Sequence, residues 1–331
     1  MRGISRDDSG VSMVFIAFLL VALIGFAGLA VDVGALYAEK TELQKGAEAA
    51  VLAIAQDCAH GTKPCDVPTA TATAEEFIDA NARDLAGAVD SISLDLAAQE
   101  VTVVDRTERR DGGGVFLPYF AQVIGFEGTT VRAQAKARWG MLSSLSSIPL
   151  TMSTCDVYDG ENLKTGTITV TFHDPSDESC DGHPGFDGGE SEVMPAGFGT
   201  LVEIEDCVAY TEAYDTPTAN MWAFQNSGSD FSEVRDCLEQ DETYLVPIFV
   251  DFMKRTDANC DAINPQPTHC YGIGGYAAFT VTAWRFPSDT VGDPGCGPPE
   301  SCLTGEIKGY SVDGEIGDSF DFGVVVVDLT G

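Results

Sequence analysis

The sequence predicts an α+β protein. An N-terminal transmembrane helix continues into an extracytoplasmic helix with a small α+β unit, and a mostly-β, disulfide-containing domain follows. Three observations predict this fold. A long uncharged apolar run lies near the N-terminus, and a helical apolar stripe follows it without a proline. The second half of the chain then alternates short apolar runs with Gly, Pro and Asp turns.

The apolar run covers residues 11–31, which are 21 positions without a charge. A helix needs roughly 20 apolar residues to cross a bilayer core. Arg2 and Arg6 lie within residues 1–10, and this favours a cytoplasmic tail there. A cleaved signal peptide is the alternative, because small residues such as Gly28 are typical of cleavage sites. The length of the run and the helix after it favour an uncleaved anchor.

The helical pattern continues beyond the apolar run. Apolar residues recur there on one face of a helix, at Leu36, Leu43, Ala47, Ala50 and Ile54. We expect one long helix that leaves the membrane and packs this stripe on the next layer. Such a helix suits contact with other helices, both in lipid and just outside it.

Five segments of this helix resemble the N-terminal domain of TadG-like proteins, which belong to the tight-adherence (Flp) pilus-assembly group. They are residues 10–15, 29–34, 36–37, 43–44 and 47–53. The shared pattern is an apolar span, V-D-x-G, an aromatic residue, L-Q and an Ala-rich helix. The resemblance implies a membrane-anchored accessory of pilus assembly exposed in the cell envelope.

Within the V-D-x-G pattern, the resemblance implies that Asp32 and Gly34 help to position the helix. Two features of related proteins are absent from the sequence. The D-x-S-x-S run of a von Willebrand A metal site does not occur. Gly10 is followed five residues later by Phe15, whereas prepilin processing usually requires Glu there. We therefore expect neither that metal module nor assembly as a processed pilin subunit.

The segment after the long helix predicts a small α+β layer. Residues 74–88 show the pattern of an amphipathic helix, and residues 112–125 that of a loop and a short helix. Alternating residues predict strands at 91–96, 100–104 and 129–139.

Charge divides the chain. Residues 146–331 hold 33 acidic and 6 basic side chains, so most of the chain's net charge of −34 lies in this part and little lies in residues 1–145. This shift and a Ser-rich stretch predict a linker at 141–149, between an N-terminal unit at 32–140 and an acidic domain at 150–331. Phosphate backbones repel such a chain, which argues against a nucleic-acid partner.

The acidic domain is predicted to be mostly β. Its predicted strands are residues 166–173, 199–203, 244–250, 276–286 and 322–329, with one helix at 233–240. Its segments PAGFGTL, LVPIFVDF and GYAAFTVTAW resemble C-terminal regions of actinobacterial proteins of this pilus-assembly type.

Ten cysteines indicate an oxidising compartment. None lies in a C-x-x-C pair, which argues against zinc ribbons and thioredoxin-like sites. Spacing favours pairs between neighbours and up to five disulfides, and reduced thiols in a cytosolic protein are the alternative. The candidates, in chain order, are Cys58, Cys65, Cys155, Cys180, Cys207, Cys237, Cys260, Cys270, Cys296 and Cys302.

No motif in the sequence predicts catalysis, and we expect no enzyme activity and no cofactor. A G-x-S-x-G nucleophile is absent, and the glycines at 112–114 lack the Lys-Ser/Thr of a phosphate loop. The four histidines, His60, His173, His183 and His269, do not pair at metal-ligand spacing. The acidic loop at 173–190 has the oxygen ligands of a hard-cation site, but it lacks the pattern of a calcium hand, and we favour a solvated acidic loop closed by Cys180.

Three hypotheses for function follow. The first is a single-pass, membrane-anchored structural or accessory protein of Flp pilus assembly, with a cytoplasmic N-terminus and an extracytoplasmic domain. Its partners are membrane lipid and, through the N-terminal helix, pilus-assembly or pseudopilin-like membrane proteins. The second is a tethered extracytoplasmic module that binds a cation, a carbohydrate or an adhesion partner. The third is a secreted hydrolase with an unfamiliar acidic site.

Overall fold

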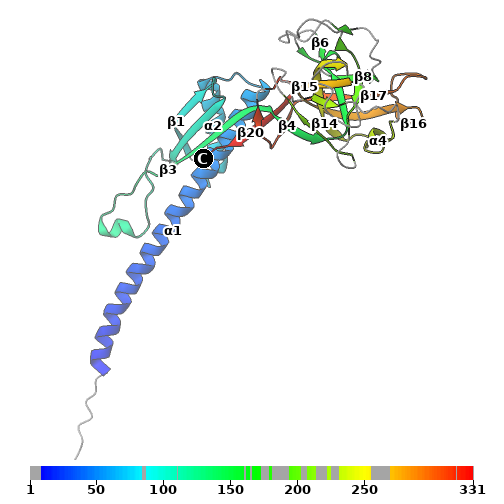
Figure 1. The fold of residues 1–331 in the computed structure, drawn as a ribbon. Coiled ribbons are helices and arrows are strands. Elements are labelled where there is room, and N and C mark those ends of the chain that lie inside the picture. Colours follow the sequence, from blue (N-terminus) through cyan, green and yellow to red (C-terminus); the bar gives the residue numbers. More distant parts are fainter. Residues whose placement is uncertain are drawn as a thin grey trace, which may run out of the picture. The chain divides into compact units, whose positions relative to one another are not determined.

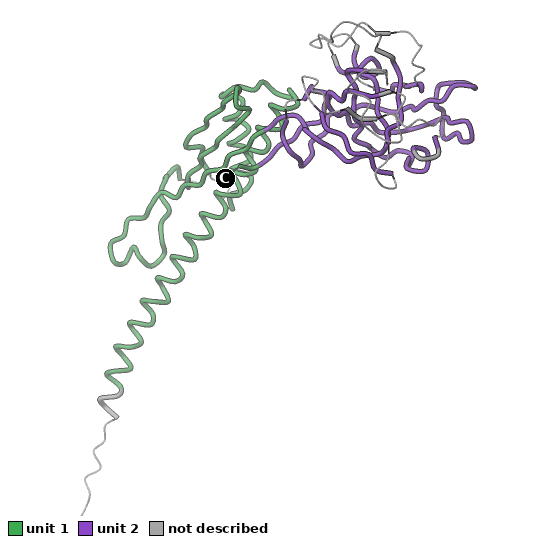
Figure 2. The backbone as a smooth tube through the Cα atoms, in the orientation of Figure 1, with its two compact units in different colours: residues 1–138, 329–331 green, residues 139–328 purple. Residues whose placement is uncertain are grey.

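The computed structural model confirms an α+β fold. It divides the chain into two compact units, residues 1–138 with 329–331 and residues 139–328 (Figure 2). The residues that it describes are 9–83, 87–109, 111–159, 162–164, 166–172, 179–180, 194–202, 207–213, 222–224, 231–254, 269–317 and 319–330.

The first unit combines two helices with a small antiparallel sheet (Figure 1). Its elements are α1 (Ser9–His60), α2 (Val67–Asn81), β1 (Gly87–Asp95), β2 (Glu100–Thr107), the 3-10 helix η1 (Ala121–Ile124) and β3 (Arg132–Leu142). Strand β3 runs on past the division into the second unit.

Helix α1 is one continuous helix of 52 residues, as the sequence predicted. At 1.5 Å per residue it is about 78 Å long. Among the described residues it is the one helix long and apolar enough to cross a membrane, with a mean hydropathy of 2.9 in its apolar part. Between Met13 and Val31 every residue is exposed apart from Gly28. This part of α1 therefore has almost no protein neighbour within the chain.

The C-terminal part of α1 forms the core of the first unit. It packs against α2 and β2, and α2 in turn packs against β1. The core side chains recur every three or four residues on α1 and meet alanine and β-branched residues of the other elements. They are Leu43, Ala47, Ala50, Val51, Ile54 and Ala55 of α1, Ala70, Ala74 and Ile78 of α2, and Val101 and Val103 of β2. The many alanines let the helices approach closely.

The sheet of this unit follows the two-residue period of a half-buried strand. Strand β2 pairs antiparallel with β1 and with β3, and its alternate residues from Val101 onward are buried. On β3, Ala133, Ala135 and Ala137 are buried, and their small side chains leave room for α1. Gln44 of α1 donates to Gln134 O at 3.2 Å, so the helix lies against this strand.

Helix α2 differs from the predicted helix at 74–88, because it spans Val67–Asn81. Asp66 caps it by accepting the N–H of Thr69 at 2.9 Å, and Pro68 lies in its first turn. These start signals precede a weakly apolar run of Thr and Ala, so the first two turns carry no clear helical periodicity. Ala88, expected at the end of the helix, lies in strand β1.

The second unit is mostly β, as predicted. Its short helices are α3 (Thr154–Val157) and α4 (Ser232–Arg235). Its strands are β4 (Ser144–Ser147), β5 (Leu150–Ser153), β6 (Tyr158–Asp159), β7 (Asn162–Leu163), β8 (Gly166–Thr171), β9 (Ser179–Cys180), β10 (Met194–Pro195), β11 (Phe198–Thr200), β12 (Ala209–Glu212), β13 (Trp222–Phe224), β14 (Thr243–Lys254), β15 (His269–Phe286), β16 (Asp289–Val291), β17 (Cys302–Lys308), β18 (Tyr310–Val312), β19 (Ile316–Gly317) and β20 (Val324–Leu329).

One sheet dominates this unit. Its strand order is β11-β5-β14-β15-β17-β8, with β13 and β16 also paired to β15. Alternate residues of β14 and β15 enter different apolar clusters, so the sheet is buried on both faces. Ile248 and Phe279 belong to one cluster, and Phe249 and Ala278 to the other. This arrangement explains why both strands are apolar almost throughout.

Two sequence expectations differ from the structure here. The Ser-rich segment at 141–149, expected as a linker, contains the end of β3 and strand β4, which pairs with β12. The helix expected at 233–240 is the single turn α4, and the chain leaves it before Cys237. In both segments, polar residues form hydrogen bonds with distant parts of the chain. The local sequence pattern does not reveal these contacts.

Disulfides join neighbours in chain order. The structure pairs Cys58 with Cys65, Cys207 with Cys237 and Cys296 with Cys302. The first closes the connection between α1 and α2. Cys155 and Cys270 are also disulfide-bonded. Their expected pairs, 155–180 and 260–270, include side chains that lie outside the described part of the chain.

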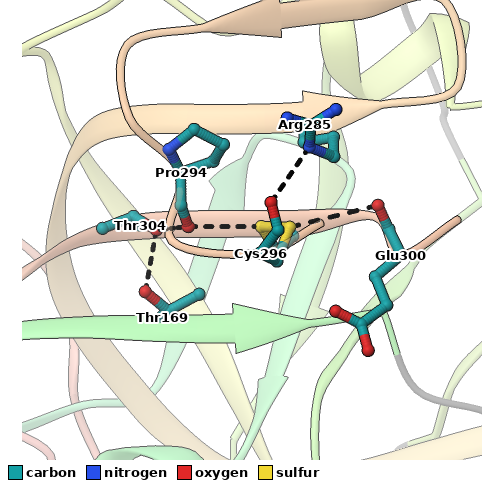
Figure 3. Close-up of a disulfide and its surroundings, with 7 residues drawn as sticks. Thr169, Arg285, Pro294, Cys296, Glu300 and Thr304 are labelled. Atoms are coloured by element: carbon teal, nitrogen blue, oxygen red, sulfur yellow. Dashed lines mark hydrogen bonds between the residues drawn. A yellow bond between two sulfur atoms is a disulfide. The ribbon is translucent and has the colours of Figure 1, made fainter. Parts of the chain in front are cut away.

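The Cys296–Cys302 bridge sits in a hydrogen-bonded turn before β17 (Figure 3). Arg285 Nε donates to Cys296 O at 3.1 Å, and Thr304 Oγ1 donates to Pro294 O at 2.5 Å. Thr169 and Thr304 share a hydrogen bond of 2.9 Å between their hydroxyls. The turn is thus fixed by its neighbours on β8, β15 and β17 as well as by the bridge.

Candidate functional site

Asp32 is a buried carboxylate at the C-terminal end of the apolar part of α1, and only 5% of its surface is exposed. Its Oδ1 accepts the N–H of Tyr119 at 2.6 Å, and its Oδ2 accepts the N–H of Ala121 at 2.7 Å. The N–H of Phe120 lies 3.1 and 3.0 Å from these two oxygens. Three consecutive backbone donors, almost 90 residues away in sequence, therefore converge on one side chain.

These donors stand at the start of η1. The first N–H groups of a helical turn have no partner inside the helix, and a carboxylate there also meets the positive end of the helix dipole. Asp32 thus acts as an N-cap supplied by another element. In return, the three donors offset the cost of removing a carboxylate from water. Gly125 ends the turn with φ 87°, a conformation that favours glycine.

Gly28 lies one helical turn before Asp32 and makes room for the ring of Phe120. A Cβ built at Gly28 would lie 2.9 Å from Phe120 Cγ, closer than real Cβ contacts. Ile24 and Leu29 line the same apolar groove beside Gly28. Any side chain at position 28 would therefore push η1 away from α1.

We call residues 115–126 the apolar loop. It has no charged residue, whereas Asp111 and Glu127 flank it. At the base of the loop, Phe116 and Thr129 exchange backbone hydrogen bonds of 2.8 and 3.1 Å. In Figure 1 the loop leaves the sheet and follows α1 toward its N-terminal end. Its exposed large side chains are Leu117 at 38%, Tyr119 at 72%, Phe120 at 49%, Val123 at 86%, Ile124 at 84% and Phe126 at 48%.

The helix residues singled out from the sequence lie in three settings. Asp32 holds the apolar loop, and Leu36 is half-buried just beyond it. Leu43, Ala47 and Ile54 are buried in the core of the first unit. Gly34 is exposed, with nothing within 4 Å of a built Cβ. The structure therefore gives no packing role to Gly34 within the chain.

Gly28 and the apolar loop were not recognised as site residues in the sequence. The signal for the loop was present, since an uncharged stretch of 15 residues, 112–126, between charged ones is unusual for a surface loop. The signal for its partner was not, because no local pattern links Asp32 to residues 119–121.

Asp105 is a second buried carboxylate, on the face of β2 that packs against α1. Its Oδ1 accepts the N–H of Ala133 at 3.2 Å. Its Oδ2 is buried and has no hydrogen-bond partner among the described residues. Burial raises the pKa of Asp105 to about 7, against the opposing effects of the Ala133 N–H and the charge of Lys40.

This carboxyl makes the stability of the first unit depend on pH. Because the pKa of Asp105 is about 7 in the folded chain and 3.8 for an ordinary aspartate, the folded state holds the proton more tightly. We expect the free energy of unfolding to fall as pH rises from about 4 to about 7, with a contribution of at most about 1.4 kcal/mol per pH unit. Asp105→Asn should remove this slope in denaturant titrations across that range.

An exposed carboxylate on the same sheet provides the control. Asp95→Asn should leave the slope between pH 4 and 7 as it is in the unaltered chain, on the order of 1 kcal/mol per pH unit. Equal slopes in the unaltered chain and in Asp105→Asn would show that Asp105 does not hold the proton.

A metal centre has no support in the part of the chain that the structure describes. No group of three or more His, Cys, Asp or Glu residues there could hold an ion. The acidic loop at 173–190, with His173 and His183, falls outside the described residues except for the backbone of 179–180, and Cys260 also falls outside them.

Comparison with known proteins identifies one segment. Residues 10–57 match a family described as putative Flp pilus-assembly TadE/G-like. The N-terminal segment is therefore TadE/G-like, in agreement with the resemblance seen in the sequence. The match includes the apolar run, Asp32 and most of the core stripe of α1. No curated protein and no solved structure matches the chain.

Proposed function

We propose that this chain, with its TadE/G-like N-terminal segment, is a single-pass membrane protein with a structural or accessory role in Flp pilus assembly. The N-terminal tail is cytoplasmic, residues 11–31 cross the membrane, and the chain after residue 31 lies on the outer side. The family match supports involvement in Flp pilus assembly. The proposal assigns the chain no catalytic activity.

The observation that carries the proposal is that α1 has an exposed apolar part followed by a buried part. Between Met13 and Val31 its large apolar side chains are exposed by half or more, a state that water disfavours and a bilayer favours. From Leu43 onward the same helix is the core of a folded unit. None of the large side chains between Met13 and Val31 is part of that core, so their exposure points to a separate role as an anchor.

Export is supported by chemistry at the other end of the same helix. The Cys58–Cys65 disulfide starts in the last turn of α1, and three described pairs are oxidised. Disulfides persist in extracytoplasmic compartments and are rare in the cytosol. Arg2 and Arg6 before the span favour the same orientation.

We further propose that the exposed face of the span contacts other pilus-assembly or pseudopilin-like membrane proteins. Small residues such as Ala17, Ala22 and Gly25 lie among the large apolar side chains, and small residues favour helix packing in lipid.

Protease treatment of intact cells tests the orientation. We expect the chain after residue 31 to be digested without lysis, while a fragment containing residues 11–31 stays protected. Protection of residues 139–328 until the cells are lysed would contradict the proposed topology.

Gene deletion and exchange of the span test the role in pilus assembly. We expect deletion to abolish or sharply reduce surface Flp pili, and the full chain to restore them. A chain in which residues 11–23 are replaced by an unrelated apolar helix keeps the groove at Ile24, Gly28 and Leu29, and thus serves as the matched variant. Full rescue by this variant would mean that the inner part of the span acts only as an anchor. Normal piliation after deletion would refute the function.

A further inference from the structure

The depth of η1 along α1 follows from its contacts. On α1 the groove beneath η1 is lined by residues from Ile24 to Asp32, and the apolar run ends at Val31. At 1.5 Å per residue, the lining residues from Ile24 to Leu29 lie about 3–10 Å inside the outer end of the run, and Asp32 lies just beyond it. A bilayer that surrounds the run must therefore also surround the part of the apolar loop that lies beside it.

The loop has the composition that this depth requires. Val123 and Ile124 are 86% and 84% exposed, and residues 115–126 carry no charge. Tyr119, with 72% exposed, combines an apolar ring with a hydroxyl, as is typical of side chains at the level of lipid headgroups. The exposed amide of Gln122 is the side chain that opposes transfer into lipid, and its Nε2 donates to Pro118 O at 2.5 Å, which lowers that cost.

Several backbone N–H groups of the loop also have hydrogen-bond acceptors within the chain, as an apolar medium requires. Irregular backbone is costly in lipid, because unpaired N–H and C=O groups have no water to bind. Asp32 accepts the N–H groups of residues 119–121, and the N–H of Phe126 donates to Ala121 O at 3.1 Å. The carboxylate therefore explains how a non-helical segment can lie beside a membrane span.

The geometry points to a second membrane contact: the apolar loop inserts into the outer leaflet beside α1, with the side chains of Val123 and Ile124 among the lipid acyl chains. This inference rests on the proposed membrane anchor. Lipid is the occupant because the loop packs beside the span, and the large apolar side chains of both are exposed at the same depth. With two contacts, the tilt of the first unit relative to the membrane is restricted.

Tryptophan quenching by brominated phosphatidylcholine tests the insertion. The full chain is reconstituted at low protein-to-lipid ratio as Val123→Trp, with Ile16→Trp as the positive control in the span. Leu96→Trp is the matched control, because Leu96 is also exposed and apolar but lies between β1 and β2. The three native tryptophans give a common background in every variant.

We expect lipid quenching of Val123→Trp to be several-fold above that background and comparable to that of Ile16→Trp, while Leu96→Trp stays at background. Quenching of Ile16→Trp alone would overturn the insertion and leave the anchor intact. Acrylamide would then show whether water or a second copy of the chain covers position 123. No quenching of either variant would overturn the anchor and the insertion together.

Discussion

Replacing Asp32 with alanine is expected to release the apolar loop from α1. The change removes the acceptor of three backbone N–H groups at Tyr119, Phe120 and Ala121. Hydrogen bonds to a charged group are worth about 1.5–3 kcal/mol each. We therefore expect amide exchange at these three positions to accelerate by about tenfold or more, measured by hydrogen–deuterium exchange on the full chain in lipid nanodiscs.

Two further variants make this result specific. Asp32→Asn keeps one acceptor oxygen and should give an intermediate acceleration. Asp95→Ala removes an exposed carboxylate that accepts two backbone N–H groups in the turn between β1 and β2, each at 3.0 Å. It should leave exchange at residues 119–121 unchanged. Slow exchange at these amides in Asp32→Ala would show that the carboxylate does not hold the loop.

Replacing Ile54 with alanine is expected to weaken the core of the first unit. Ile54 is 2% exposed and lies on the face of α1 that packs on α2 and β2. Truncating a buried isoleucine removes apolar contact and leaves a cavity, at a cost of about 2–5 kcal/mol. Denaturant titration with the disulfides intact should show this loss. Exchange of the β2 amides at Val101 and Val103 should show it as well.

Val67 provides the matched control for this change. It is also a β-branched residue of the first unit, but it is 49% exposed at the start of α2. Val67→Ala should cost under about 0.5 kcal/mol, as is usual for surface substitutions. Equal losses in the two variants would mean that the stripe on α1 is not the core.

The sequence predicted those parts of the fold that have a local signal. Helix α1 follows from an apolar run and a helical stripe that together cover 52 residues without a proline. Strands such as β2 and β15 follow from alternation and β-branched residues. The spacing of the cysteines indicated the pairs that the structure describes, such as Cys58 with Cys65.

Only part of the candidate site could be predicted from the sequence. Asp32 stood out as a charge at the end of an apolar span, but its partners lie near residue 120 and are backbone groups. No pattern of side chains reveals such a contact. Gly28 was noticed as a possible cleavage-site residue, whereas in the structure it provides space for Phe120. The roles of Asp32 and Gly28 both depend on the path of the apolar loop, which is distant in sequence.

Asp105 was missed for a related reason. A single acid in the alternating strand β2 resembles an outward-facing residue, yet it lies on the buried face. Gly46 on α1 lies beside it, since a Cβ there would meet Asp105 Oδ2 at an ordinary contact distance of 3.5 Å. Only the pairing of helix and strand brings these two positions together.

The central claim is that one helix is both a membrane anchor and the core of an exported unit. The intact mass of the unreduced protein extracted from cell membranes tests this most directly. We predict a membrane-bound chain that retains residues 11–31 and carries its cysteines as disulfides. A mature chain that begins near residue 31 and is found free in the medium would contradict the claim.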